Sequence, residues 1–222
     1  MANKKLVEYL SGFITTRRRE LFDRILEQRT RYIAVVLEDI YQPHNASAVL
    51  RSMDCFGVQD AHIIENSNEY RINPDVALGA SKWLSLMRYN AAQSNTEKAL
   101  SGLKEKGYRI VATTPHQQDV SLADFNLGEA PVALLFGTEM RGLSPTAMSM
   151  ADVHLKIPMY GFTESFNISV SAAIILYHLK EKLMQSGINW KLSPEEKTEL
   201  LFEWLKKSIK RSDLLIREFL SQ

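Results

Sequence analysis

The sequence has a single cysteine among its 222 residues, and it has no long hydrophobic run. One thiol cannot form an internal disulfide, and it fits a reducing compartment. Because Cys55 lies among Met53, Phe56 and Val58, we expect it to be buried and unreactive. A helix that spans a bilayer needs about 20 apolar residues, and residues 1–10 lack the apolar core of a signal peptide. We therefore expect a cytoplasmic protein.

Several common enzyme signatures are also missing. The sequence contains no G-x-G-x-x-G fingerprint, no P-loop and no G-x-S-x-G elbow. No set of cysteines and histidines has the spacing of zinc ligands, and we expect no metal. The missing motifs therefore argue against three classes of protein: dinucleotide-binding enzymes, enzymes that bind nucleoside triphosphates, and acyl hydrolases.

The formal net charge of +1 hides an uneven distribution. Residues 1–31 hold eight lysines and arginines against four acids, and residues 178–222 hold nine against seven. The middle of the chain, residues 32–177, holds ten basic residues against fifteen acids. Basic ends on a mildly acidic body suit a polyanion such as RNA. They also suit ordinary solvated helix surface, and charge alone leaves both interpretations open.

Hydrophobic periodicity predicts alternating strands and helices, which is typical of an α/β domain with a mainly parallel sheet. Short apolar runs predict strands, and apolar residues at helical spacing predict helices. We expect an N-terminal basic helical extension, a central domain and a C-terminal helical extension, over residues 1–31, 32–186 and 187–222. The expected strands are residues 33–37, 61–64, 108–112, 132–136 and 153–157, and the expected helices are residues 17–29, 45–56, 96–106 and 168–184, followed by two amphipathic helices after Pro194.

Three loops follow predicted strands, where ligands bind in parallel α/β sheets. The first, residues 39–51, holds Asn45 and Arg51. In one interpretation, Arg51 binds a phosphate near the start of a helix. In the other, Asn45 caps the helix and Arg51 is an ordinary surface arginine. The second, residues 136–145, has two glycines and Glu139, and Ser144 with Pro145 predicts a helix cap.

The third loop, residues 157–171, is long and partly apolar, and it ends at a helix start rich in serine and asparagine. Apolar walls with a few polar groups suit a nucleoside-like ligand. A helix capped by Ser165 or Asn167 explains the same residues without a ligand.

Taken together and in this order, the three loops resemble the motifs of the SPOUT methyltransferase superfamily, in its TrmH (SpoU) branch. The motifs appear here as residues 45–51, 135–143, and 157–159 leading into 165–173, and the likeness runs from about residue 17 to about residue 185. The resemblance implies an α/β fold with a deep trefoil knot, a homodimer, and methyl transfer from S-adenosylmethionine to a ribose 2′-hydroxyl of tRNA. The D-loop guanosine at position 18 is the expected target, with ribosomal RNA, or a non-catalytic RNA-binding adaptor, as alternatives.

The resemblance also implies roles for individual residues. A free guanidinium is a very poor base, so we expect Arg51 to assist electrostatically, with Asn45 on the substrate side. Glu139, Ser165 and Asn167 are expected to shape the site. The residues expected to bind the methyl donor are Thr113, Gly137, Glu139, Ile157, Met159, Ser165, Phe166 and Asn167, and those expected to bind RNA are Arg17, Arg18, Arg19, Arg24, Arg29 and Arg31.

Overall fold

The structure, a computed structural model, describes residues 4–221 except residues 72, 93, 116–118 and 140. It divides the chain into two compact units. One unit is Arg31–Trp190, and the other combines Met1–Thr30 with Lys191–Gln222. Among the described residues, no helix has both the length and the apolar character needed to cross a bilayer.

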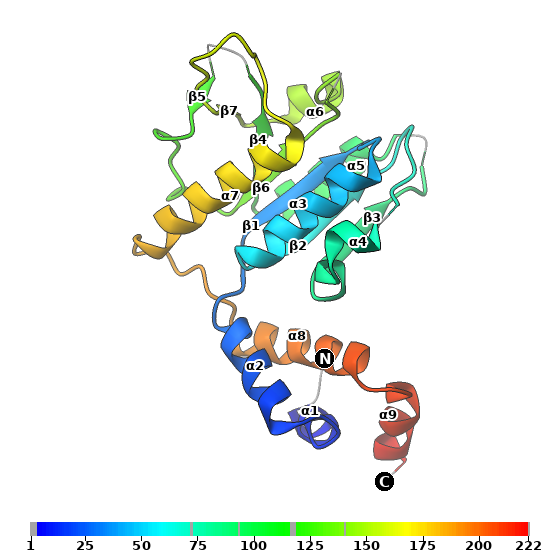
Figure 1. The fold of residues 1–222 in the computed structure, drawn as a ribbon. Coiled ribbons are helices and arrows are strands. Elements are labelled where there is room, and N and C mark those ends of the chain that lie inside the picture. The colour runs from blue at the N-terminus through cyan, green and yellow to red at the C-terminus, as the bar shows by residue number, and fades with distance from the viewer. Residues whose placement is uncertain (1–3, 72, 93, 116–118, 140, 222) are drawn as a thin grey trace. The chain divides into compact units, whose positions relative to one another are not determined.

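The larger unit is built on a seven-stranded sheet with the strand order β3-β2-β1-β6-β4-β7-β5 (Figure 1). The pairs β1/β6, β2/β3, β4/β6, β4/β7 and β5/β7 are parallel, which confirms the expected mainly parallel sheet. The trefoil knot stays a prediction. The strands are β1 (Thr30–Glu38), β2 (Val58–Ile64), β3 (Ser85–Tyr89), β4 (Arg109–Thr113), β5 (Val120–Ser121), β6 (Val132–Phe136) and β7 (Val153–Lys156).

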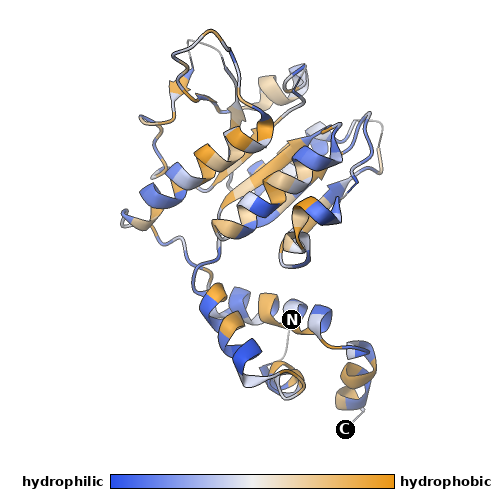
Figure 2. Ribbon diagram, viewed as in Figure 1, coloured by the Kyte–Doolittle hydropathy of each residue, from blue (hydrophilic) through white to orange (hydrophobic). Residues whose placement is uncertain are grey.

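Helices cover both faces of this sheet. Successive side chains of a strand point to opposite faces, so each face contributes its own set of residues to a buried cluster. Ile33, Val35 and Leu37 of β1 belong to one buried cluster with α3 (Pro43–Cys55) and α7 (Ile168–Met184). Ala34 and Val36 belong to a second cluster with α5 (Thr96–Glu105) and α6 (Pro145–Met150). Strand β1 is therefore apolar on both sides, which explains its continuous hydrophobic run, and its ribbon is mostly in the hydrophobic colour in Figure 2.

Local signals explain where the helices begin. The Ser144 side chain accepts a hydrogen bond from the Ala147 amide at 3.1 Å, with Pro145 in the first turn, as expected for the cap of α6. Asn167 caps α7. The expected cap at Asn45 is wrong: α3 begins at Pro43, one turn earlier, because a proline suits the first turn of a helix.

Two further features differ from expectation. Cys55 is exposed rather than buried, because it is the last residue of α3 and lies on its solvent side. Some short elements had no clear sequence signal. Besides β3 and β5, these are α1 (Lys4–Ser11), α4 (Pro74–Ala77) and the 3₁₀ helix η1 (Ala80–Lys82).

The smaller unit consists of α1, α2 (Thr16–Leu26), α8 (Pro194–Ser208) and α9 (Ser212–Leu220). The two ends of the chain pack on each other there. The rings of Phe22 and Trp204 lie 5.4 Å apart. An ion pair of 2.7 Å joins Glu27 to Lys197. Helix α8 starts with a full capping box, which satisfies backbone groups at the exposed helix end.

Candidate functional site

A pocket of about 340 Å³ opens beyond the carboxyl ends of β4, β6 and β7. Ligands bind at this edge of parallel α/β sheets, and the volume is in the range of small-molecule sites. Its walls come from the ends of these strands, the loop after β6, the loop after β7 and the first turns of α7. Three segments that are far apart in the sequence therefore form one concave site.

The loop after β6 is held in a tight turn. Thr138 and Gly142 exchange two backbone hydrogen bonds of 2.9 Å. A Cβ atom at Gly137 would overlap the backbone of Gly142 and Leu143, so only glycine fits there. Gly142 has φ +67°, in the left-handed region. These constraints fix the position of Glu139 at the edge of the pocket.

Glu139 joins the three loops through its carboxylate. Its Oε1 atom accepts a hydrogen bond from Asn45 Nδ2, and one of 2.8 Å from Asn167 Nδ2. Asn167 Nδ2 also donates to Asn45 Oδ1 at 3.2 Å. Asn45 is only 3% exposed, although it lies in the first turn of a helix. We call Asn45, Glu139 and Asn167 the carboxamide–carboxylate triangle.

The predicted donor-binding residues converge on this pocket with one exception. Asn167 does not line the pocket, but it contacts Glu139 from the N-terminus of α7. The Thr113 hydroxyl donates to the Leu135 carbonyl at 2.7 Å, so it is engaged with the backbone. The residues that line the pocket are Thr113, Gly137, Glu139, Ile157, Met159, Ser165 and Phe166.

Arg51 lies apart from these residues. It is exposed on α3 and does not line the pocket. Its guanidinium makes no hydrogen bond or ion pair with any residue that the structure describes. The fold therefore places Asn45 at the site and leaves Arg51 in solvent, nearly two helical turns further along.

The six arginines expected to bind RNA occupy different environments. Arg17, Arg18 and Arg24 are exposed on α2. Arg19 forms an ion pair of 3.0 Å with Asp23 and donates to Ser11. The other two are Arg29 and Arg31, and neither lies on an open basic surface.

Arg29 is 2% exposed, and its guanidinium carbon lies 5.4 Å from the centre of the Trp204 ring. Its expected role in RNA binding is therefore corrected: a side chain buried in this way cannot reach a phosphate, and it holds α8 against the end of α2. Arg31 belongs to the sheet unit, where its Nε lies 3.4 Å from a carboxylate oxygen of Asp60.

The sequence reading missed some site residues. Leu155 and Phe136 line the pocket as strand ends, and their apolar character is equally typical of core residues. Arg141 and Glu164 line it too, next to residues that were predicted. Glu38 is buried beneath the loop after β6, and no sequence signal distinguished it from a surface acid.

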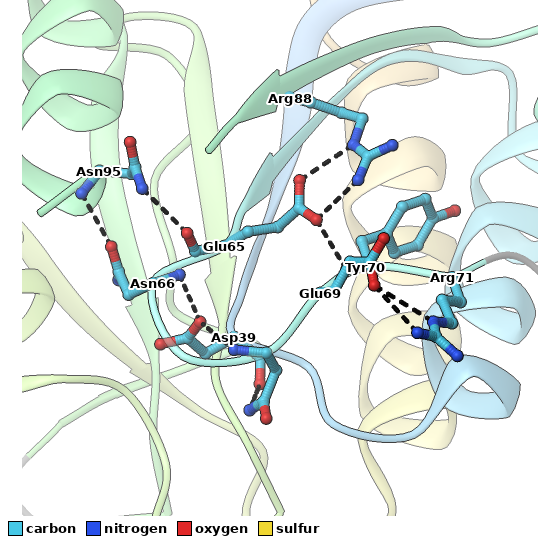
Figure 3. A network of polar contacts seen from close by, with 9 residues as sticks. Asp39, Glu65, Asn66, Glu69, Tyr70, Arg71, Arg88 and Asn95 are labelled. Carbon is cyan, nitrogen blue, oxygen red and sulfur yellow. Dashed lines mark hydrogen bonds and ion pairs between the residues drawn. The ribbon is translucent and has the colours of Figure 1, made fainter. Parts of the chain in front are cut away.

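A network of polar contacts orders the segment after β2 (Figure 3). The Asp39 carboxylate accepts backbone hydrogen bonds from Asn66 and Ser67, at 2.6 and 2.9 Å. Glu65 binds Arg88 through two hydrogen bonds of 2.9 and 2.7 Å, and these lower the pKa of the Glu65 carboxyl. Burial raises the pKa of the nearby Tyr70 hydroxyl to about 12. Hydrogen bonds therefore connect the segment after β2 to the end of β1 and to β3.

The fold and the pocket together define a class of RNA methyltransferases. The structure is similar to the A. aeolicus TrmH/SpoU tRNA modifying enzyme, with a TM-score of 0.77 and 29% identity over 87% of this chain and 98% of that chain. It is also similar to an RNA 2′-O ribose methyltransferase, with a TM-score of 0.58 and 29% identity over 71% of this chain and 58% of that one.

Sequence comparison gives the particular family. The SpoU rRNA Methylase family matches residues 32–177, and the chain belongs to this family. A tRNA (guanosine(18)-2′-O)-methyltransferase of Borreliella burgdorferi is 40% identical over 206 residues, which cover 93% of this chain and 92% of that protein. The enzyme of the same name from Thermus thermophilus is 33% identical, over 87% and 98%. The resemblance seen in the three motifs is confirmed.

Proposed function

We propose that this protein is a cytoplasmic enzyme that transfers a methyl group from S-adenosylmethionine to the ribose 2′-hydroxyl of guanosine 18 in tRNA. The observation that carries the proposal is the convergence of three family motifs on one pocket through the carboxamide–carboxylate triangle. Relatives named for this reaction match 93% and 87% of the chain.

The pocket suits the methyl donor in shape and chemistry. Ile157, Met159 and Phe166 provide apolar walls for an adenosine, and Gly137 lines the same pocket. Oε2 of Glu139 accepts no hydrogen bond from the residues that the structure describes, so it is available to a hydroxyl or amine of the ligand. When bound, the donor supplies a methyl group that its sulfonium already activates, and this chemistry needs no metal.

The remaining catalytic work is to align the ribose hydroxyl and to stabilise its oxygen as it loses a proton. The triangle fixes the edge of the pocket at which Asn45, with Ser165 across the site, would orient the ribose. The Arg51 guanidinium is available to an RNA phosphate and to the developing negative charge, because it has no partner among the described residues.

The helical unit is the proposed RNA-binding element. Residues 1–30 and 191–222 carry fourteen lysines and arginines against ten acids. Arg17, Arg18 and Arg24 point from α2 into solvent. Lys210 and Arg211 lie at a second hollow of about 470 Å³ that Phe13 also lines, and exposed aromatic and basic groups together suit RNA.

We further propose a homodimer. Helix α7 buries one side in the core, yet Val170, Tyr177 and Met184 on it are 43%, 58% and 45% exposed. A second copy would remove these apolar groups from water. Sedimentation equilibrium at micromolar concentration tests this, and a monomer would contradict it.

Methyl transfer from labelled S-adenosylmethionine tests the activity. Unmodified tRNA should accept label, while protein-free ribosomal RNA should accept little. The reverse preference would move the proposal to ribosomal RNA, which the family's name makes the second candidate. A protein that binds tRNA but neither binds nor uses the donor would instead be an adaptor.

A further inference from the structure

The last residue of β1, Glu38, is a buried carboxylate beneath the loop that borders the pocket. Glu38 is only 3% exposed. Oε2 accepts a hydrogen bond from the Ser144 amide at 2.8 Å, and Oε1 accepts one from the Ser144 hydroxyl at 2.7 Å. Oε1 also accepts from the Thr96 hydroxyl at 2.6 Å. Glu38 forms no ion pair with any residue in the described ranges.

This arrangement favours a carboxylate. A buried charge is costly unless hydrogen bonds satisfy it, and hydrogen bonds to an ionised acceptor are stronger than neutral ones. Both oxygens of Glu38 receive donors, at Ser144 and Thr96. A carboxamide has the same shape but only one acceptor oxygen, so it would present an N–H group to one of these donors.

Ser144 connects Glu38 to the pocket. It is the N-cap of α6 and the first residue after the turn of residues 137–143. One end of this turn is fixed by β6 in the centre of the sheet, and the other end is fixed at Ser144. Glu139 and Gly137 lie between these two fixed points. Hydrogen bonds between Thr138 and Gly142 hold the turn internally, and Glu38 adds an anchor at the end that leads into α6.

We propose that Glu38 is a positioning residue for the methyl-donor pocket, acting through Ser144 on the turn that carries Glu139. The inference rests on the proposed function, because it takes the pocket to be the donor site. Glu38 itself does not line the pocket. Its effect on catalysis comes from the geometry that it imposes, which sets donor affinity more than the rate at saturation.

Thr96 offers a matched control. It starts α5 and accepts a hydrogen bond from Asn66 at 2.9 Å. Thr96→Val removes one hydrogen bond to Glu38 on the side away from the turn. Ser144→Ala removes one hydrogen bond to Glu38 on the side of the turn, together with the cap to the Ala147 amide, and leaves the backbone hydrogen bond from Ser144 to Glu38 in place.

The experiment measures binding of S-adenosylhomocysteine by calorimetry to the full-length protein and to these variants. Glu38→Gln should bind about tenfold more weakly, and Ser144→Ala about threefold more weakly, while Thr96→Val stays within about twofold of the wild type. In turnover, Glu38→Gln should raise the KM for the donor about tenfold. Its kcat at saturating donor and its KM for tRNA should change by less than about threefold.

The outcomes separate clearly. Wild-type affinity in a folded Glu38→Gln, or equal losses in Thr96→Val and Ser144→Ala, would overturn the positioning role. If Glu38→Gln does not fold, Ser144→Ala against Thr96→Val decides the question. A wild-type protein that binds no S-adenosylhomocysteine would overturn the proposed function itself, whereas normal wild-type binding with unaffected variants would overturn this inference alone.

Discussion

Arg51 illustrates how the surroundings of a motif residue determine the role that it can have. The fold buries Asn45 in the carboxamide–carboxylate triangle and leaves Arg51 exposed on the same helix. A guanidinium in solvent has the right charge to stabilise a developing oxyanion, but it is too weak a base to remove the proton. Its contribution therefore depends on the bound RNA.

Replacing Arg51 with alanine should lower kcat/KM for tRNA by at least about 100-fold, since it removes an electrostatic contact to the transition state. S-adenosylhomocysteine should bind the variant as it binds the wild type, because Arg51 does not line the pocket. Steady-state kinetics and calorimetry measure the two effects. Arg71→Ala, at an exposed arginine paired with Glu69, serves as the control and should be neutral. Full turnover by Arg51→Ala would exclude the role.

Single residues also show which features could be predicted from the sequence and which could not. Gly137 was expected to let the backbone approach a ligand, whereas the structure shows that glycine is required there because the backbone of Gly142 and Leu143 packs against it. The burial of Arg29 was not predictable, because its partner Trp204 is distant in the sequence. Asn45 was expected to cap α3, and the preceding Pro43 determines the actual start.

At the scale of elements, β2 and β3 are joined by Glu65 and Arg88. The Glu65 side chain is 6% exposed and lies 2.7 Å from the guanidinium. Because the folded-state pKa of Glu65 is lowered, the contact stabilises the protein above the unfolded pKa. This stability is lost as the pH falls through the lower, folded-state pKa.

We therefore expect Glu65→Gln to lose about 2 kcal/mol of unfolding free energy at pH 7. The difference from the wild type should shrink as the pH falls below about 4.3, since the unfolded carboxyl then takes up a proton. Urea unfolding at several pH values measures it. Glu69→Gln is the matched control, because both partners of its ion pair are mostly exposed and the pair should contribute little. A pH-independent difference would contradict this account.

The arginines of α2 and Arg29, which follows this helix, separate RNA binding from stability. Changing Arg17, Arg18 and Arg24 together to glutamate should weaken tRNA binding about 10- to 100-fold near 0.1 M salt, with a shallower salt dependence. Arg29→Ala should instead lose about 2 kcal/mol of stability through its contact with Trp204. Fluorescence anisotropy and thermal unfolding give the two readouts. Unchanged tRNA affinity in the triple variant would remove α2 from the RNA-binding surface.

The elements themselves were predictable to different degrees. Strands β1 and β6 are buried on both sides, so they appear as continuous apolar runs. Strand β3 lies at the edge of the sheet and is only partly buried, so its residues show no clear pattern. The start of α7 was predicted with Ser165 or Asn167 as its cap, because capping chemistry is local, and the structure has Asn167 as the cap.

At the scale of the whole molecule, α/β alternation gave the fold class, while the order of the strands needed the structure. Strand β6 lies between β1 and β4, and periodicity carries no information on such crossovers. The two terminal segments each looked like a separate extension. They form one compact unit because their apolar faces are complementary, which no local pattern records.

The most direct test of the central claim is to map the nucleotide methylated in a tRNA transcript by the purified protein with S-adenosylmethionine. The account predicts one 2′-O-methylguanosine at position 18 of the D-loop, and no product when that guanosine is replaced by a 2′-deoxyguanosine. Methylation of a base, of another ribose, or of ribosomal RNA in preference to tRNA would contradict it.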